Sequence, residues 1–242
     1  MFIRNINSVG RFALTLLTGL SLACTQHSTE PDMLTNPNAS ASKYTFLSLG
    51  DSYTIGESVS ESDRWSVQLA GLLRKDDVDV ANPDIIARTG WTTSQLQSAI
   101  IASGNQKTYS LVSLLIGVNN QYQGLSQATF RTELSQLLQT ATRFADNKIN
   151  HVLVLSIPDW GASPYGARSD RAKITQEIDQ FNAIVKDECQ KSGIAFVDIT
   201  PLTRSANGDA SQFADDGLHY SGEQMQLWAQ KALPIAKTLL AN

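Results

Sequence analysis

From residue 44 onward, short apolar runs alternate with longer segments whose apolar residues recur at helical spacing. The run YTFLSL comes first, and DRWSVQLAGLLRK follows with Trp65, Leu69 and Leu73 at that spacing. The runs predicted to be strands are 44–49, 83–90, 109–117, 151–161 and 194–200. The segments predicted to be helices are 63–75, 92–103, 126–145, 170–193 and 222–240. Regular alternation of this kind is typical of α/β chains.

The pattern predicts a three-layer α/β/α sandwich around a five-stranded, mostly parallel sheet. Its strands are near-continuous apolar runs, as expected when both faces of a sheet are covered. The last helical segment contains Pro234, which predicts a kink at that point. Functional groups in such sheets collect at the carboxyl ends of the strands, so the residues that follow each strand are the candidates for chemistry.

The first 43 residues follow a different pattern. Residues 1–23 carry Arg4 and Arg11, followed by a short apolar stretch. This stretch leads into SLAC at 21–24, whose last residue is Cys24. A basic head before a short apolar core is typical of a secretory signal peptide, and it is too short to span a bilayer comfortably. The SLAC ending resembles the bacterial lipobox, although Ser21 stands where Leu is usual.

We therefore expect a lipoprotein-type signal peptide over 1–23, followed by lipidation of Cys24. Ordinary signal cleavage nearby, without a lipid, is the alternative. Residues 24–43 are rich in Ser, Thr, Asn and Pro and lack apolar periodicity, which predicts a flexible tether. Such a linker has a typical end-to-end distance on the order of 25 Å. The expected product is exported and held in the cell envelope, at the periplasm or cell surface, with its folded domain over 44–242.

Composition and charge limit the possible partners. The chain has 242 residues, of which 42% are hydrophobic and 17% charged, and this suits one globular domain. Its formal net charge is -4 and its basic residues form no dense cluster, which disfavours a nucleic-acid-binding protein. Cys189 has no metal-ligand spacing around it and is interpreted as a structural thiol. No zinc-binding or phosphate-binding motif occurs, so we expect no metal and no cofactor.

The first predicted strand ends in Gly-Asp-Ser, which is either an ordinary turn into a helix or the site of a nucleophile, Ser52. A serine nucleophile needs a base that is neutral near pH 7, and histidine fills that role most often. The chain has three histidines. His27 falls in the tether, and His151 begins the fourth strand, at the amino end of the sheet. Only His219 follows the last strand.

Asp216 lies three residues before His219, a spacing at which a turn brings two side chains together. Its carboxylate is the expected acceptor for His219 Nδ1, with Asp215 as the competing candidate. An acyl-transfer site also needs hydrogen-bond donors for the oxyanion. The backbone N–H of Gly90, the side-chain amide of Asn119 and the backbone N–H of Ser52 follow the second, third and first strands and are the candidate donors.

Four sequence blocks then resemble the SGNH hydrolases, also called GDSL esterases and lipases. They are GDSYTIGE with Ser52, ARTGWTT with Gly90, IGVNN with Asn119, and DGLHYS with Asp216 and His219. All four occur in the order that the family uses, from residue 45 to residue 240. The chain departs from the family in the third block, which commonly reads Gly-x-Asn-Asp and here ends in Asn120.

The resemblance implies an SGNH, flavodoxin-like fold and a serine esterase that works through an acyl-enzyme without a cofactor. Trp91, Trp160 and Tyr165 follow strand ends and are predicted to line the substrate site. Small or short-chain acyl esters are the expected substrates. The alternatives are a lysophospholipase or thioesterase, a glycan O-acetyl esterase, or a non-catalytic envelope binding module on the same fold. We expect a monomer that meets the membrane only through its lipid anchor.

Overall fold

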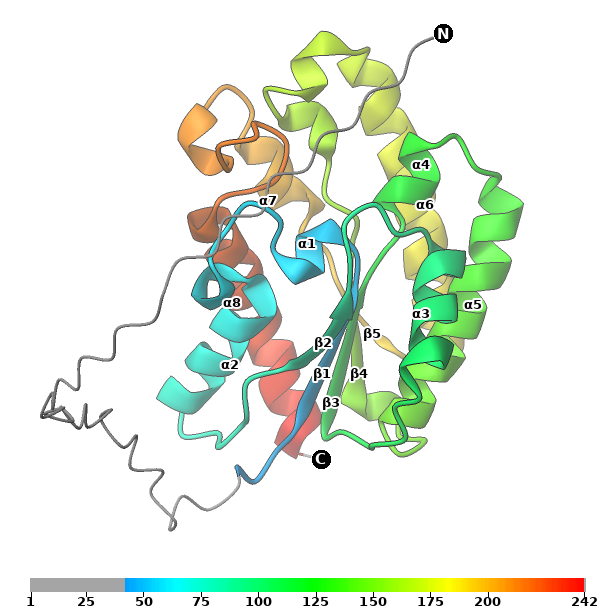
Figure 1. The fold of residues 1–242 in the computed structure, drawn as a ribbon, viewed down its shortest axis with the longest axis vertical. Helices are drawn as coiled ribbons and strands as arrows, with labels where there is room; N and C mark the ends of the chain where they lie inside the picture. Colours follow the sequence, from blue (N-terminus) through cyan, green and yellow to red (C-terminus); the bar gives the residue numbers. More distant parts are fainter. Residues whose placement is uncertain (1–41, 242) are drawn as a thin grey trace, which may run out of the picture. The chain divides into compact units, whose positions relative to one another are not determined.

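A computed structural model describes residues 42–241 of the chain (Figure 1). The predicted signal peptide and nearly all of the tether lie outside the described residues. The described part contains one five-stranded sheet in the order β2-β1-β3-β4-β5, and every neighbouring pair of strands is parallel. The strands are β1 Phe46–Gly50, β2 Asp84–Ala87, β3 Leu111–Leu115, β4 Val152–Leu155 and β5 Ala195–Val197. The predicted fold class is confirmed.

Long helices cover both faces of this sheet (Figure 1). On one face lie α2 Trp65–Lys75 and α8 Gly222–Ala241, and on the other lie α3 Thr93–Ser103, α5 Gln127–Phe144 and α6 Arg171–Ser192. Pro234 lies inside α8, which continues beyond it. None of the helices within residues 42–241 is long and apolar enough to cross a membrane.

Three short helices lie just beyond strand ends. They are α1 Ser52–Ile55, α4 Val118–Tyr122 and α7 Thr200–Ser205, which come after β1, β3 and β5. Segments of four to six residues are too short to show a helical repeat in the sequence. The strand predicted over 109–117 is therefore longer than the observed one. In the structure β3 ends at Leu115, and Gly117 is the N-cap of α4. These short helices carry Ser52 and Asn119 at the carboxyl edge of the sheet.

The central strands are buried along their whole length. All five residues of β1 and all five of β3 are buried, because helices pack on both faces. Ser48 and Ser113 are the polar exceptions. They face each other in register and share a hydrogen bond of 2.9 Å between their hydroxyls, so neither is buried without a partner.

Two residues that the sequence analysis left out of the predicted site, His151 and Cys189, lie away from the carboxyl edge. His151 ends a short 3₁₀ turn before β4, and its Nδ1 lies 2.8 Å from the carbonyl oxygen of Ser110, at the amino end of the sheet. Cys189 is fully buried on α6, and burial raises the pKa of its thiol to about 12. A thiol with so high a pKa is protonated and unreactive near neutral pH.

Candidate active site

The turn from β1 into α1 places Ser52 at the carboxyl edge of the sheet. Asp51 caps α1 by accepting a hydrogen bond of 3.1 Å from the Tyr53 backbone N–H. Gly50 ends the strand, and only glycine fits there. A Cβ on Gly50 would lie 2.2 Å from Thr54 Oγ1 and 2.4 Å from the carbonyl oxygen of Leu115. The chain therefore turns sharply and presents Ser52, whose exposed fraction is 4%.

Asp51 is a fully buried carboxyl group directly before Ser52. Burial raises its pKa to about 7, and the backbone N–H groups of Tyr53, Asp51 itself and Gly117 lower the pKa in part. The desolvation of the charged form outweighs these hydrogen bonds. In the folded protein, Asp51 therefore loses its proton at a much higher pH than it does in the unfolded chain.

Replacing Asp51 with Asn is expected to change how stability depends on pH. Between the unfolded pKa of about 3.9 and the folded pKa of about 7, wild type loses stability as the pH rises, because the folded state holds a proton that the unfolded state has released. The asparagine variant has no such ionisation. Relative to wild type, Asp51→Asn should gain on the order of 4 kcal/mol between about pH 4 and pH 8, measured by urea unfolding. Parallel pH curves for the two proteins would contradict this.

Asp216 holds His219 in place through three hydrogen bonds. Asp216 Oδ2 lies 2.6 Å from His219 Nδ1, and Asp216 Oδ1 accepts from the backbone N–H groups of Leu218 at 2.8 Å and His219 at 2.9 Å. One carboxylate therefore orders both the turn and the imidazole. The competing candidate, Asp215, makes no hydrogen bond to the His219 ring among the described residues.

A long-range contact also orients the Asp216 carboxylate. Ser58, just beyond α1, donates a hydrogen bond of 2.7 Å from its hydroxyl to Asp216 Oδ2. Partial burial raises the pKa of Asp216, but the hydrogen bonds from His219, Leu218 and Ser58 outweigh it and lower the pKa to about 2. Asp216 is therefore a carboxylate throughout the neutral range and is ready to stabilise a protonated imidazole.

His219 and Ser52 line the same pocket. The ring of Tyr53, the residue after Ser52, packs edge-on against His219 with 5.5 Å between ring centroids. Within residues 42–241, no hydrogen bond joins the Ser52 hydroxyl to the His219 ring. Hydrogen bonds of this kind are often long before a substrate binds and tighten in the complex.

Two of the three candidate oxyanion donors, Gly90 and Asn119, lie beyond β2 and β3. Gly90 has a φ of +85° in the loop between β2 and α3, a conformation that favours glycine. Asn119 lies on α4 and donates a hydrogen bond of 3.0 Å from Nδ2 to the carbonyl oxygen of Trp91. The amide nitrogen carries two hydrogens, so this contact fixes the side chain and leaves one donor for a ligand. Gly90, Asn119 and Ser52 all line the pocket.

The pocket itself has a volume of about 180 Å³. The residues that line it are Ser52, Tyr53, Thr89, Gly90, Val118, Asn119, Tyr122, Trp160, Leu218 and His219. None of these side chains is a carboxylate, a lysine or an arginine. Burial raises the pKa of Tyr53 and the hydrogen bond with Tyr165 raises that of Tyr122, so both phenols are neutral near pH 7. Within the described part of the chain, no group of His, Cys, Asp and Glu is arranged to hold a metal ion.

Of the three aromatic residues predicted to contact substrate, only Trp160 lines this pocket. Its indole N–H donates a hydrogen bond of 2.7 Å to Gln121. Trp91 contributes its carbonyl oxygen to Asn119 instead, and Tyr165 is not part of the lining, although its hydroxyl lies 3.1 Å from that of Tyr122. Sequence reasoning missed Tyr122, which lines the pocket and is 55% exposed. Its place three residues after Asn119 was the available signal.

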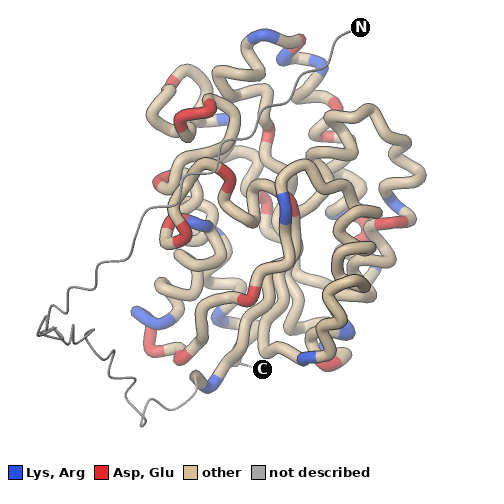
Figure 2. The backbone as a smooth tube through the Cα atoms, in the orientation of Figure 1, with Lys and Arg blue, Asp and Glu red and all other residues tan. Residues whose placement is uncertain are grey.

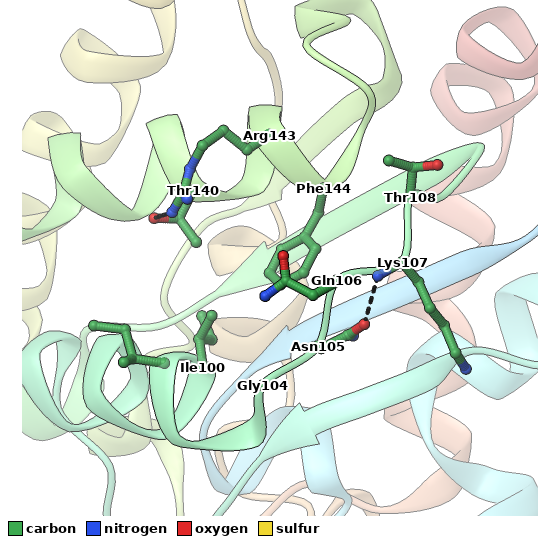
Figure 3. Close-up of a pocket in the computed structure, with 10 residues that line it drawn as sticks. Ile100, Gly104, Asn105, Gln106, Lys107, Thr108, Thr140, Arg143 and Phe144 are labelled. Carbon is green, nitrogen blue, oxygen red and sulfur yellow. Dashed lines mark hydrogen bonds between the residues drawn. The ribbon is translucent and has the colours of Figure 1, made fainter.

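A second, larger cavity contains none of the candidate residues. It has a volume of about 270 Å³ and lies between the C-terminal ends of α3 and α5 and the loop before β3 (Figure 3). Ile100, Phe144, Thr140 and Arg143 form part of its wall. This cavity is at the amino end of the sheet, whereas the candidate nucleophile and base are at the carboxyl end. We therefore place the active site in the smaller pocket.

The fold is shared with solved esterase structures. TesA is 20% identical and superposes with a TM-score of 0.62, over 81% of this chain and 99% of that chain. The psychrotrophic esterase EstA from Pseudoalteromonas sp. is 16% identical, with a TM-score of 0.62 over 82% of this chain and 100% of that chain. Axe2, an acetylxylan esterase from Geobacillus stearothermophilus, is 16% identical, with a TM-score of 0.61 over 81% and 95%. At these identities the similarity establishes the fold alone.

A search of curated proteins found no significant match to the chain. The model of the GDSL-like lipase/acylhydrolase family, however, matches residues 48–227, which is most of the chain and includes Ser52, Asp216 and His219. The match begins inside the strand that precedes Ser52 and continues beyond the turn that holds His219, so it includes every residue that lines the pocket described above. The chain therefore belongs to the GDSL-like lipase/acylhydrolase family and is a carboxylic ester hydrolase.

Proposed function

We propose that the protein is a serine esterase that hydrolyses small or short-chain acyl esters through an acyl-enzyme on Ser52. The observation that carries this proposal is the arrangement of one pocket. Ser52 and His219 both line it, and Asp216 Oδ2 lies 2.6 Å from the Nδ1 of His219. Asp216 thereby keeps the Nδ1 proton in place and leaves Nε2 as the basic nitrogen.

In the first step, Ser52 Oγ forms a bond to the ester carbonyl carbon while its proton passes to His219 Nε2. The carbonyl oxygen becomes an oxyanion, which accepts hydrogen bonds from Ser52 N–H, Gly90 N–H and Asn119 Nδ2. The carbon–alkoxy bond then breaks as His219 returns the proton to the leaving alcohol. Water repeats the sequence on the acyl-enzyme, releases the carboxylic acid and restores Ser52.

The size of the pocket supports a small acyl group. Its volume of about 180 Å³ is below the roughly 300–1,000 Å³ of pockets that enclose drug-sized ligands. Its walls are mainly apolar around the Ser52 hydroxyl, with Val118 and Leu218 among them. An acetyl to butyryl chain is the group that such a space accommodates without rearrangement of the walls.

The alcohol part of the ester is assigned to the open side of the pocket. Tyr122 lies there with 55% of its surface exposed. The ring is held by its edge-on contact with Trp160, 5.4 Å between centroids, and by the hydroxyl pair with Tyr165. An exposed but immobilised aromatic ring provides a flat apolar surface with a polar rim. This surface suits an uncharged alcohol.

A series of p-nitrophenyl esters tests the proposal. We expect the highest kcat/KM for acetate to butyrate and a loss of at least about tenfold by decanoate, because a chain longer than the pocket must displace its walls to reach the reactive position. Acetylated sugars in the same panel test whether the Tyr122 side receives a sugar ring. No turnover of any ester would refute the function, and a rise of kcat/KM with chain length would refute the short-chain assignment alone.

A further inference from the structure

Asn120 stands where the family commonly has Asp, and it lies within a buried hydrogen-bond chain. Its exposed fraction is 1%. Asn120 Oδ1 accepts a hydrogen bond of 3.1 Å from the backbone N–H of Thr93, and Asn120 Nδ2 donates one of 2.7 Å to Thr93 Oγ1. The Thr93 hydroxyl in turn donates to the carboxylate of Glu133 on α5.

The direction of every bond in this chain is determined. A backbone N–H can only donate, so the Asn120 atom that faces it is the carbonyl oxygen and the other atom is the amide nitrogen. Because that nitrogen donates to Thr93 Oγ1, the single hydroxyl proton of Thr93 remains for Glu133, which as a carboxylate can only accept. The amide of Asn120 is therefore the partner that the Thr93–Glu133 pair requires.

These hydrogen bonds join the segments that carry two of the three candidate oxyanion donors, Gly90 and Asn119. Thr93 is the first residue of α3, three positions after Gly90, and Asn120 directly follows Asn119 on α4. The only other side-chain hydrogen bond between these segments in the described structure is the one from Asn119 Nδ2 to Trp91. The spacing between the Gly90 N–H and the Asn119 amide therefore depends on the Asn120–Thr93 contact.

We propose that Asn120, together with Thr93 and Glu133, sets the geometry of the oxyanion hole, and that Glu133 is the reason why position 120 is Asn in this chain. The inference rests on the proposed function, in which Gly90 and Asn119 stabilise the oxyanion. Asn120 is a positioning residue, because it lies outside the pocket lining and acts through Thr93 and its neighbour Asn119.

An Asp at position 120 is predicted to break the chain of hydrogen bonds, although it is the family's common residue. Its Oδ1 still accepts from the Thr93 N–H, but its second oxygen then competes with Glu133 for one Thr93 hydroxyl proton. A buried carboxylate at position 120 and the half-buried Glu133 carboxylate would then share one hydroxyl proton, which is unfavourable. In the double variant, Asn120→Asp with Glu133→Gln, the Gln amide at position 133 supplies the missing donor. The Thr93 hydroxyl then accepts from that amide and donates to the carboxylate at position 120.

The experiment compares Asn120→Asp, Glu133→Gln and the double variant with wild type on p-nitrophenyl acetate. Asn120→Asp should lower kcat about 10- to 100-fold with little change in KM, because displaced donors affect mainly the transition state. Glu133→Gln alone keeps an acceptor for the Thr93 hydroxyl, the Gln amide oxygen, so its kcat should fall less than that of Asn120→Asp. The double variant should recover to within about threefold of wild type.

The Ki of a reversible trifluoromethyl ketone tests whether Asn120 acts on the oxyanion hole. This Ki would not change if Asn120 had a purely structural role. The ketone forms a tetrahedral oxyanion on a serine hydroxyl, so its Ki should rise in Asn120→Asp by the same factor by which kcat/KM falls. Unchanged kinetics in Asn120→Asp, or a double variant no more active than the single one, would overturn the proposal. If Asn120→Asp does not fold, Thr93→Val and Thr93→Ser are compared instead. Thr93→Val, which lacks the hydroxyl, should lose at least tenfold more kcat than Thr93→Ser, which keeps it, and equal losses would overturn the proposal.

Asn119→Ala separates this inference from the proposed function. Loss of one oxyanion donor typically lowers kcat by roughly 100- to 1,000-fold. If Asn119→Ala keeps full activity, the proposed oxyanion hole is wrong. If Asn119→Ala loses activity and Asn120→Asp does not, the oxyanion hole stands and only the role of Asn120 is refuted.

Discussion

Ser52→Ala is expected to abolish ester hydrolysis, with a fall in kcat on the order of a millionfold. In the proposed mechanism, Ser52 Oγ is the only protein atom that forms a bond to the substrate, so the alanine variant leaves His219 with no nucleophile to deprotonate. The fold should survive, because Ser52 is 4% exposed at the start of a short helix and its Oγ makes no hydrogen bond within the described residues. The measurement is kcat on p-nitrophenyl acetate, with thermal unfolding as a check.

Removing the base provides the matched comparison. His219→Gln should lose about as much as Ser52→Ala, and the double variant should lose little more, because residues that act as one unit are not additive. A burst of one equivalent of p-nitrophenol before steady state in wild type, absent from Ser52→Ala, would report the acyl-enzyme. Equal turnover by wild type and Ser52→Ala would remove Ser52 from the mechanism.

Asp216→Asn is expected to lower kcat on the order of 10,000-fold while it preserves the local turn. The amide oxygen of the variant can still accept from the backbone N–H groups of Leu218 and His219. The amide nitrogen, however, would face His219 Nδ1 with a hydrogen, which forces that ring nitrogen to be the acceptor and places the imidazole proton on Nε2. The ring would then present a proton, rather than a lone pair, to Ser52. The measurement is kcat on p-nitrophenyl acetate.

Two neighbouring substitutions control for charge and packing in the same turn. Asp215→Asn removes a negative charge one residue away, but Asp215 does not hold the His219 ring, so kcat should stay near wild type. Ser58→Ala removes one of the hydrogen bonds that lower the pKa of Asp216 and should have a smaller effect than Asp216→Asn. If Asp215→Asn loses more kcat than Asp216→Asn, then Asp215, and not Asp216, is the carboxylate that supports His219.

The charge distribution agrees with an uncharged substrate. Lys and Arg lie scattered among Asp and Glu along the described chain in Figure 2, without one extended basic area in that view. Arg204, a cation close to the site, is already paired. Its Nε lies 2.8 Å from Asp159 and its Nη2 lies 2.7 Å from Asp179. Asp159 directly precedes Trp160 and Asp179 lies on α6, so Arg204 ties the loop that carries Trp160 to that helix.

Local patterns in the sequence were enough to predict the sheet and the edge at which the site lies. Apolar runs that alternate with helical periodicity determine a parallel α/β sheet, since only burial on both faces suits such strands. Turn chemistry places Gly50 and Ser52 at the end of β1, and the i,i+3 spacing predicts the contact between Asp216 and His219. These are interactions between residues that are close in sequence.

Contacts between residues far apart in sequence were decided only by the tertiary structure. Ser58 reaches Asp216 across 158 positions, and Asn120 reaches Thr93 across 27 positions. The same is true of the pocket wall, where Trp160 and Tyr122 line the space but Trp91 and Tyr165 do not. Periodicity and spacing report which face a residue takes within its own element. They do not report which two elements meet, because that depends on how all the side chains between them pack.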